Sequence, residues 1–177
     1  YAKDFVTLID ETINDIYDKN IKIIANAGGV NPKACSHEIL KICEKNNINM
    51  NIGIIEGDDI FSNIDNLIKV GVDFKNMDTG QEFNTIRDKV YSANVYIDSF
   101  CIAEALDQNA QIVLAGRVTD PGLAVGTMIH EFNWSRNSYN LLAAGTLAGH
   151  IIECGAQCTG GNYSNWQNVE DLANIGY

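Results

Sequence analysis

Apolar residues recur along this chain with two alternating kinds of spacing. Over residues 3–18 they stand three or four positions apart, which predicts a helix with one apolar face. Helical spacing or helix-start residues predict further helices over 32–46, 60–70, 98–106, 120–132 and 138–153. Short apolar runs rich in β-branched residues predict strands over 21–25, 48–55, 90–97 and 112–115. Residues 71–88 are polar with little periodicity, which predicts a loop with a short helical turn.

Strands that alternate with helices indicate parallel β-α units. We therefore expect an α/β fold with a mostly parallel sheet and helices on both faces. The length of 177 residues suits one domain with a sizeable core, spanning residues 1–177. The chain begins at Tyr1 within a helix-like pattern and stops at Tyr177 without a closing element, so we expect this domain to be incomplete at both ends.

Particular residues mark the ends and the packing of the helices. Asn31–Pro32 and Asp120–Pro121 each combine a capping residue with a proline suited to the first helical position. Asp98 or Ser99 should cap the helix that follows them. Glycine lowers helix propensity by about 1 kcal/mol, so glycines inside a helix suggest close approach to another backbone. The last predicted helix carries such a stripe of small residues: Ala144, Gly145, Ala148 and Gly149.

The composition argues against several classes of partner. The chain has 23 acidic and 12 basic residues, a net charge of −11, and should therefore repel nucleic acid and anionic membrane surfaces. No apolar run is long enough to span a bilayer. The five cysteines are odd in number and scattered. This pattern favours reduced thiols in the cytoplasm and argues against a structural zinc site.

Four polar turns that contain glycine each follow an apolar stretch, at residues 26–32, 56–59, 116–122 and 155–162. The first three come where a strand should end, and open parallel sheets bind ligands at the carboxyl ends of their strands. We therefore expect these three turns to lie at one edge of the sheet and to form a ligand site.

Two of these turns suggest an anion site. Asn26, Gly28 and Gly29 could offer backbone N–H groups to an anion, or form a tight turn that needs glycine. Their spacing matches neither the dinucleotide fingerprint nor the P-loop. Arg117 could clamp a carboxylate or phosphate with its planar guanidinium, or form a salt bridge with Asp120 or the acidic turn. Asp120 is most simply a helix cap.

The acidic turn holds Glu56, Asp58 and Asp59. Three neighbouring carboxylates could bind Mg²⁺ or another divalent metal, or raise the pKa of one of them, with Glu56 the candidate for acid–base catalysis. The alternative is a solvated loop in which Asp58 or Asp59 caps the next helix.

The end of the last helix is a second candidate for chemistry. His150, Glu153 and Cys154 stand at i, i+3 and i+4, which places them on one helix face. This spacing suits a His–Glu general base or part of a metal site, or a packed histidine beside the glycine stripe. Cys154 as a nucleophile has less support, because nothing in the sequence lowers its pKa. A polar loop that could close over a ligand follows, with Thr159, Gly160, Gly161 and Asn162.

At these turns the chain resembles the acyclic terpene utilisation family of the AtuA type, formerly a domain of unknown function. The matching segments are Asn26–Pro32, Glu56–Asp59, Asp78–Gly80, Ser92–Asn94, Gly116–Arg117 with Asp120, His130–Phe132, Ala144–Asn162 and Asp171–Gly176. The resemblance runs from about residue 20 to the end and implies an internal piece of the family's N-terminal domain. It also implies a role in the catabolism of acyclic isoprenoids or related branched acyl-CoA acids, without naming a reaction.

Two hypotheses follow. In the first, the protein is an enzyme or enzyme subunit that acts on a small acidic ligand or an acyl-CoA, with a CoA thioester and a divalent metal as the groups to test. In the second, it is a non-catalytic subunit or scaffold that binds a partner enzyme or a second copy of itself. Convergence of Glu56, Arg117 and His150 in one pocket would favour the enzyme. A nucleotide-binding oxidoreductase is disfavoured because no dinucleotide fingerprint is present.

Overall fold

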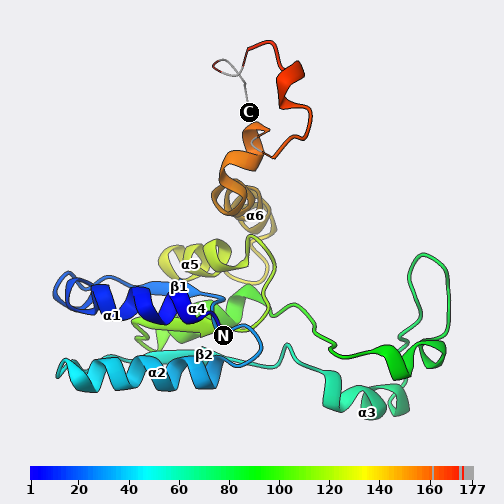
Figure 1. Cartoon of the computed structure of the whole chain (residues 1–177), viewed down its shortest axis with the longest axis horizontal. Helices are drawn as coiled ribbons and strands as arrows, with labels where there is room; N and C mark the ends of the chain where they lie inside the picture. The colour runs from blue at the N-terminus through cyan, green and yellow to red at the C-terminus, as the bar shows by residue number, and fades with distance from the viewer. Residues whose placement is uncertain (161, 172, 174–177) are drawn as a thin grey trace. The chain divides into compact units, whose positions relative to one another are not determined.

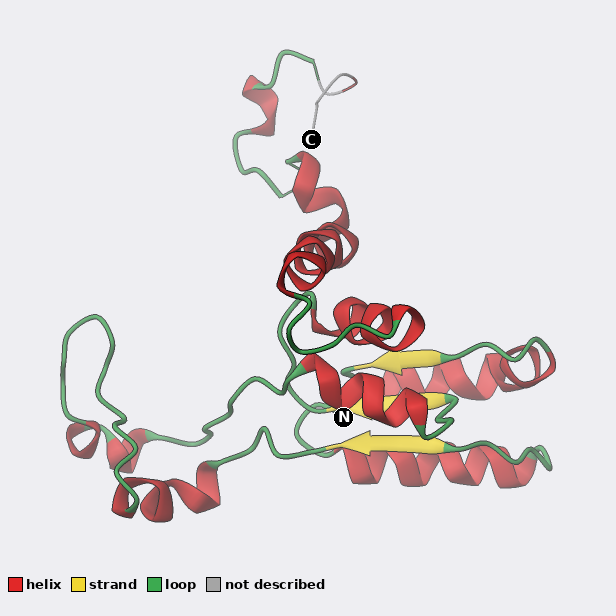
Figure 2. Cartoon of the chain, turned by 180° about the vertical axis from the view of Figure 1, so that it is seen from behind, coloured by secondary structure: helices red, strands yellow, loops and turns green. Residues whose placement is uncertain are grey.

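The computed structural model describes residues 1–160, 162–171 and 173, so part of the segment Asp171–Gly176 lies outside it. The chain is an α/β protein with a three-stranded parallel sheet and helices around it, which confirms the predicted fold class (Figure 2). It divides into two compact units, one of residues 1–97 with 110–118 and one of residues 98–109 with 119–177. We describe each unit by itself; the single domain expected from the sequence stays a prediction.

The first unit contains the sheet. Its elements are α1 (Lys3–Asp18), β1 (Ile23–Ala25), α2 (Pro32–Lys45), β2 (Ile52–Ile55), α3 (Ile64–Lys69) and β3 (Ile112–Ala115) (Figure 1). The strand order is β1-β3-β2, and β3 pairs in parallel with both neighbours. The sheet therefore places the last strand of the chain in its centre.

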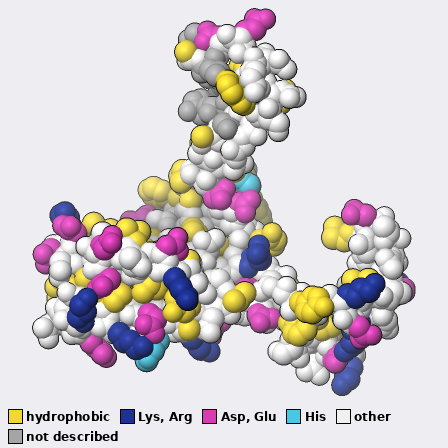
Figure 3. Space-filling view, viewed as in Figure 1, with side chains coloured by type: hydrophobic (Ala, Val, Ile, Leu, Met, Phe, Trp, Pro, Cys, Tyr) yellow, Lys and Arg dark blue, Asp and Glu magenta, His cyan; other side chains and the backbone are white. Residues whose placement is uncertain are grey.

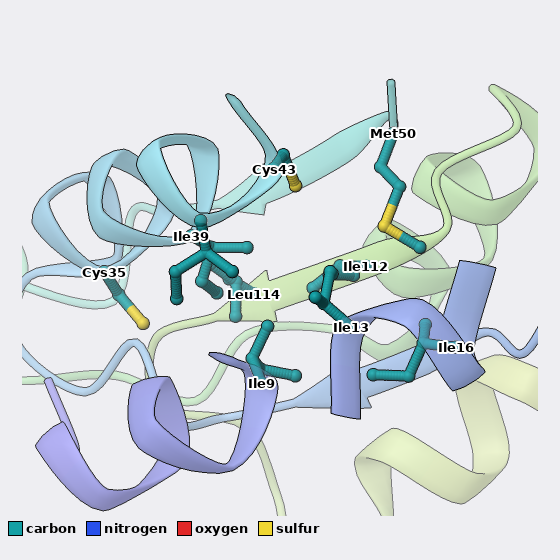
Figure 4. Close-up of a cluster of buried hydrophobic side chains, with 10 residues drawn as sticks. Ile9, Ile13, Ile16, Cys35, Ile39, Cys43, Met50, Ile112 and Leu114 are labelled. Atoms are coloured by element: carbon teal, nitrogen blue, oxygen red, sulfur yellow. The ribbon is translucent and has the colours of Figure 1, made fainter. Parts of the chain in front are cut away.

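The core of the first unit lies between the sheet and the pair α1 and α2. Ile9 and Ile13 of α1 and Ile39 of α2 point toward Ile112 and Leu114 of β3 (Figure 4). All four residues of β3 are buried, so both faces of the central strand are covered. The outer sides of α1 and α2 carry interspersed acidic and basic side chains (Figure 3). This distribution is that of two amphipathic helices seated on a sheet.

Most local signals in the first unit are confirmed. Asn31 caps α2, since its Oδ1 accepts a hydrogen bond of 3.0 Å from the N–H of Ala34, and Pro32 follows at the first helical position. Residues 71–88 form a loop that contains a short 3₁₀ helix at Phe83–Thr85, and a second one follows at Arg87–Lys89. The helix expected over 60–70 is a 3₁₀ turn, Phe61–Asn63, that continues into α3.

The strand predicted over residues 90–97 is wrong. This segment makes only isolated bridges, one between Asp59 and Asn94 and one between Ile97 and Val118. Its β-branched and aromatic residues are mostly exposed, with Tyr91 at 91%. β-propensity mainly reflects packing on a half-buried sheet surface. Without such a surface the segment remains extended but does not join the sheet.

The second unit is helical, with α4 (Ser99–Asp107), α5 (Gly122–Phe132) and α6 (Tyr139–Cys154). Ala103 of α4 and Val125 and Ile129 of α5 form its small core. Asp98 caps α4, as predicted, by accepting a hydrogen bond of 2.9 Å from the N–H of Phe100. Two further short 3₁₀ helices follow α6, at Gly155–Thr159 and Trp166–Asn168.

Asp98 also forms an ion pair with Arg136, which lies in the connection between α5 and α6. Its Oδ2 lies 2.7 Å from Nη1 of Arg136, whose guanidinium packs over the Phe100 ring. Partial burial opposes ionisation of Asp98, but the Phe100 N–H and Arg136 outweigh it and lower the pKa of this carboxyl. The cap of α4 is therefore ionised at neutral pH.

Two predictions for the second unit need correction. Asp120 does not cap α5: Pro121 occupies the cap position, and the N–H of Gly122 bonds to the carbonyl of Thr119 at 2.7 Å. This backbone turn satisfies the donor that the Asp120 side chain would have taken.

In the stripe on α6, a Cβ on Gly149 would lie 2.9 Å from the Pro121 carbonyl oxygen, as expected for close backbone approach. A Cβ on Gly145 would instead meet the Trp134 ring at 2.7 Å, so its neighbour is a side chain.

No helix in the part of the chain that the structure describes is long and apolar enough to cross a membrane.

Candidate functional site

The strand ends of the first unit meet at one edge of the sheet. Ala25 of β1 pairs with Leu114 of β3, and Ile55 of β2 pairs with Ala115, all in parallel. The turns at residues 26–29, 56–59 and 116–118 therefore leave the sheet at the same edge, as predicted. Asp120 belongs to the second unit, so its part in this site stays a prediction.

The turn after β1 is tightly packed. A Cβ on Gly28 would lie 2.6 Å from the Pro32 Cβ and 2.9 Å from the Ala115 carbonyl oxygen, so only glycine fits there. Gly29 has a φ of 51°, and its N–H bonds to the Asn26 carbonyl at 3.1 Å. These contacts account for both glycines structurally. A role of this turn in binding an anion stays a prediction.

Asp58 is the buried carboxylate of this edge, with 5% of its surface exposed. Its Oδ2 accepts two hydrogen bonds of 3.0 Å, one from the backbone N–H of Arg117 and one from Nδ2 of Asn94. A Cβ on Gly116 would overlap the same carboxylate, so the residue that follows β3 must be glycine for Asp58 to fit. Asp58 therefore joins the ends of β2 and β3 to the segment around Asn94.

The other two acidic side chains of the turn are engaged separately. Glu56 is exposed and forms an ion pair of 2.6 Å with Lys33 in the first turn of α2. Asp59 accepts a hydrogen bond of 2.9 Å from the N–H of Phe61, the first residue of the following 3₁₀ turn. Among the described residues, no group of three or more His, Cys, Asp or Glu side chains is placed to hold a metal ion. The predicted capping role of Asp59 is not confirmed, because the cap position of this 3₁₀ helix is Ile60.

Arg117 differs from its expected environment. One of the two alternatives for Arg117 was a salt bridge with Asp120 or the acidic turn, but its side chain is exposed and Glu56 pairs with Lys33 instead. No carboxylate of the described chain lies within 4.0 Å of its guanidinium, which sits 6.0 Å from the centre of the Tyr96 ring. Its backbone is anchored by Asp58 while its charge remains available at the edge of the sheet.

The candidates on α6 lie in the second unit. His150 and Glu153 are exposed, and no hydrogen bond between them is present in the described part of the chain. The Cys154 Sγ lies 4.0 Å from Nδ1 of His150 and donates to Oε2 of Glu153 at 3.4 Å. The hydrogen bond to Glu153, with burial and the charge of Glu153, raises the pKa of the Cys154 thiol. Cys154 is therefore a protonated thiol, the opposite of an activated nucleophile.

The loop after α6 is only partly described. Thr159 ends a 3₁₀ helix, and Gly160 follows it in the left-handed region at a φ of 79°. Asn162 is exposed, and Gly161 lies outside the described residues. Closure of this loop over a ligand stays a prediction, as does convergence of His150 with Glu56 and Arg117, since these residues belong to different units.

Sequence reasoning missed three residues of the edge: Lys33, Asn94 and Tyr96. Lys33 neutralises Glu56, Asn94 bonds to Asp58, and Tyr96 lies under Arg117. Asn94 is separated from Asp58 by 36 positions, and the segment Ser92–Asn94 was noted only for its resemblance to a family. No local pattern could have placed it against the acidic turn.

Comparison of the chain with curated protein sequences and with solved structures gives no match. The family model described as "Acyclic terpene utilisation family protein AtuA" matches residues 1–177, which is the whole chain and more than the segments recognised in the sequence. Three of the turns that carried the resemblance, at residues 26–29, 56–59 and 116–118, leave the sheet at one edge, whereas the segment Ala144–Asn162 belongs to the second unit. The chain therefore belongs to the acyclic terpene utilisation family of the AtuA type.

Proposed function

We propose that this protein is an enzyme or enzyme subunit in the catabolism of acyclic isoprenoids, and that it binds an acidic ligand or acyl-CoA through Arg117. Family membership indicates a role in acyclic terpene utilisation. The finer statement, a branched carboxylic acid or its CoA thioester as ligand, follows from the chemistry at the edge of the sheet. Carboxylate and phosphate groups are the ligands that a guanidinium recognises with two parallel hydrogen bonds.

The observation that carries this proposal is the unpaired Arg117 side chain. The chain has 23 acidic and 12 basic residues, and an arginine there would be expected to find a carboxylate. Arg117 has none within ion-pair distance in the described chain, although Glu56 and Asp58 lie in the neighbouring turn. Asp58 holds the backbone of Arg117 and not its guanidinium, so an incoming anion need not displace an internal partner.

The surrounding groups support a ligand at this edge. The Asn26–Gly29 turn leaves the sheet beside β3 and precedes α2, whose N-terminus favours negative charge. Glu56 is the group of this edge that we propose for proton transfer; His150 and Glu153 are the corresponding candidates within the second unit. The raised pKa of Cys154 argues against a covalent thioester step on that thiol.

Calorimetric titration with 3-methylbutanoate, 3-methylbutanoyl-CoA and CoA tests the proposal, with and without Mg²⁺. We expect at least one of the three to bind. Arg117→Ala should then weaken binding by about 1.5–3 kcal/mol, the contribution of a hydrogen bond to a charged group. Arg117→Lys should weaken it less, because it keeps the charge but loses the planar fork.

Lys69→Ala removes another exposed cation of the same unit, at the end of α3, and serves as the matched control that should bind like wild type. Equal affinities of wild type, Arg117→Ala and Lys69→Ala would contradict the proposal. In that case Arg117 is a surface residue, and the non-catalytic alternative gains support.

A non-catalytic subunit is the second candidate, favoured by the exposed apolar side chains of α6. Leu147 and Ile152 are each about two thirds exposed, and Leu141 and Ile151 add to the same helix. Exposed apolar surface of this kind suits a partner subunit or a second copy. Light scattering after gel filtration tests this: a concentration-dependent mass that Leu147→Ser with Ile152→Ser abolishes would favour it, and a monomer would argue against a homo-oligomer.

A further inference from the structure

A cavity of about 330 Å³ lies in the first unit, and its lining contains no residue of the strand-end turns. Its walls come from the 3₁₀ turn Phe61–Asn63 with the start of α3 on one side, and from residues 83–90 on the other. Small-molecule sites have volumes of about 300–1,000 Å³, so this cavity is at the lower end of that range. We infer that it binds a small neutral molecule with an apolar chain that ends in a hydroxyl group.

Four of the side chains that line the cavity are apolar: Phe61, Ile64, Phe83 and Val90. Ile64 is buried, and the Phe83 ring packs against Phe74 with ring centres 5.5 Å apart, so this wall is held in place. Phe61 is 44% exposed and leaves apolar surface facing solvent. An apolar chain that covered this wall would remove its surface from water.

The other lining side chains are polar and carry both signs of charge. Asp65 and Arg87 form an ion pair, and Asp88 and Ser62 complete the lining. Two carboxylates and one guanidinium give the lining one net negative charge. Arg87 is already neutralised by Asp65, and no ion pair of Asp88 is present in the described residues.

This arrangement selects against charged head groups. A carboxylate would have to displace Asp65 from Arg87 and would face Asp88, and an ammonium group would face Arg87. A hydroxyl group can donate to a carboxylate and accept from a guanidinium at the same time. It also loses less hydration than an ion when it leaves water. Repulsion of the wrong head group and a match to the right one together give the specificity.

The inference is independent of the proposed function, because it uses no residue of the Arg117 edge. Three probes with the same eight-carbon chain test it on the full chain: octan-1-ol, octanoate and octylammonium. Calorimetry or nuclear magnetic resonance titration should show saturable binding of octan-1-ol, with both ions at least tenfold weaker. Absence of saturable octan-1-ol binding, or equal affinities for the three probes, would overturn the inference.

Variants locate the binding and test the head-group argument. Phe83→Ala and the more exposed Phe61→Ala should each weaken octan-1-ol binding at least fivefold, whereas Tyr91→Ala, an exposed aromatic residue just beyond the lining, should leave it unchanged. Asp88→Asn makes the net charge of the lining zero and should narrow the difference in affinity between octan-1-ol and octanoate. Unchanged binding in both phenylalanine variants, or an unchanged difference in Asp88→Asn, would contradict the assignment.

Discussion

Replacing Asp58 with alanine should destabilise the first unit more than the loss of an ordinary surface carboxylate. Two donors, the Arg117 N–H and Nδ2 of Asn94, share its Oδ2 at 3.0 Å. Hydrogen bonds to a charged group contribute about 1.5–3 kcal/mol each. The two bonds together set an upper limit of about 3–6 kcal/mol on the loss.

Asn94 is exposed and can replace its lost bond with water, so the expected loss lies below that limit. We expect Asp58→Ala to lower the free energy of unfolding by about 2–4 kcal/mol. Asp58→Asn keeps the shape and one acceptor oxygen but loses the charge, and should cost about 1–2 kcal/mol. Both changes should act on the first unit, which contains all three residues.

Urea unfolding followed by far-ultraviolet circular dichroism measures these differences. Asp78→Ala is the matched control, since Asp78 is an exposed carboxylate of the same unit, and its change should stay within about 0.5 kcal/mol. A double-mutant cycle of Asp58→Asn with Asn94→Ala should give a coupling of about 0.5–3 kcal/mol. Equal urea midpoints for Asp58→Ala and Asp78→Ala, together with no coupling energy between Asp58 and Asn94, would refute the inference that Asp58 stabilises the strand ends.

Three further outcomes are expected in the second unit. Asp98→Ala should lower the free energy of unfolding by about 1 kcal/mol at pH 7, measured by urea unfolding. Because the pKa of Asp98 is lowered in the folded state, this difference should be complete above the ordinary aspartate pKa of about 4. It should disappear as the pH falls through the lowered pKa of the folded state. Gly149→Leu should overpack the contact with the neighbouring backbone and cost about 1–3 kcal/mol or more in thermal unfolding, whereas exposed Ala144→Leu should change little; equal melting curves would show that the contact is not tight. Glu153→Gln should lower the pKa of Cys154 and speed its alkylation by iodoacetamide at pH 8, followed by mass spectrometry of the peptide, and an unchanged rate would show that Glu153 does not control this thiol.

Elements whose signals are local could be predicted from the sequence alone. The helix expected over residues 3–18 has those bounds in the structure, because the 3.6-residue spacing of its apolar residues is a property of that one short segment. The cap and proline that begin α2 act within a few residues of each other. The four apolar residues of β3 likewise predicted a buried strand. Parallel pairing then followed from the alternation of strands and helices, and with it the common edge of the three turns.

The environment of each charged group at that edge was decided by the tertiary structure. The acidic turn offers three carboxylates in four positions, yet only the fold buries Asp58, pairs Glu56 with Lys33 and leaves Arg117 without a carboxylate. Asp58 and Arg117 are 59 positions apart, so their contact depends on the alignment of β2 with β3 and appears in no local pattern. The missing strand at residues 90–97 has the same origin, because its propensity could not act without a surface to pack on. Periodicity and capping reside within a segment, whereas burial, ion pairing and sheet membership depend on which distant segments the folded chain brings together.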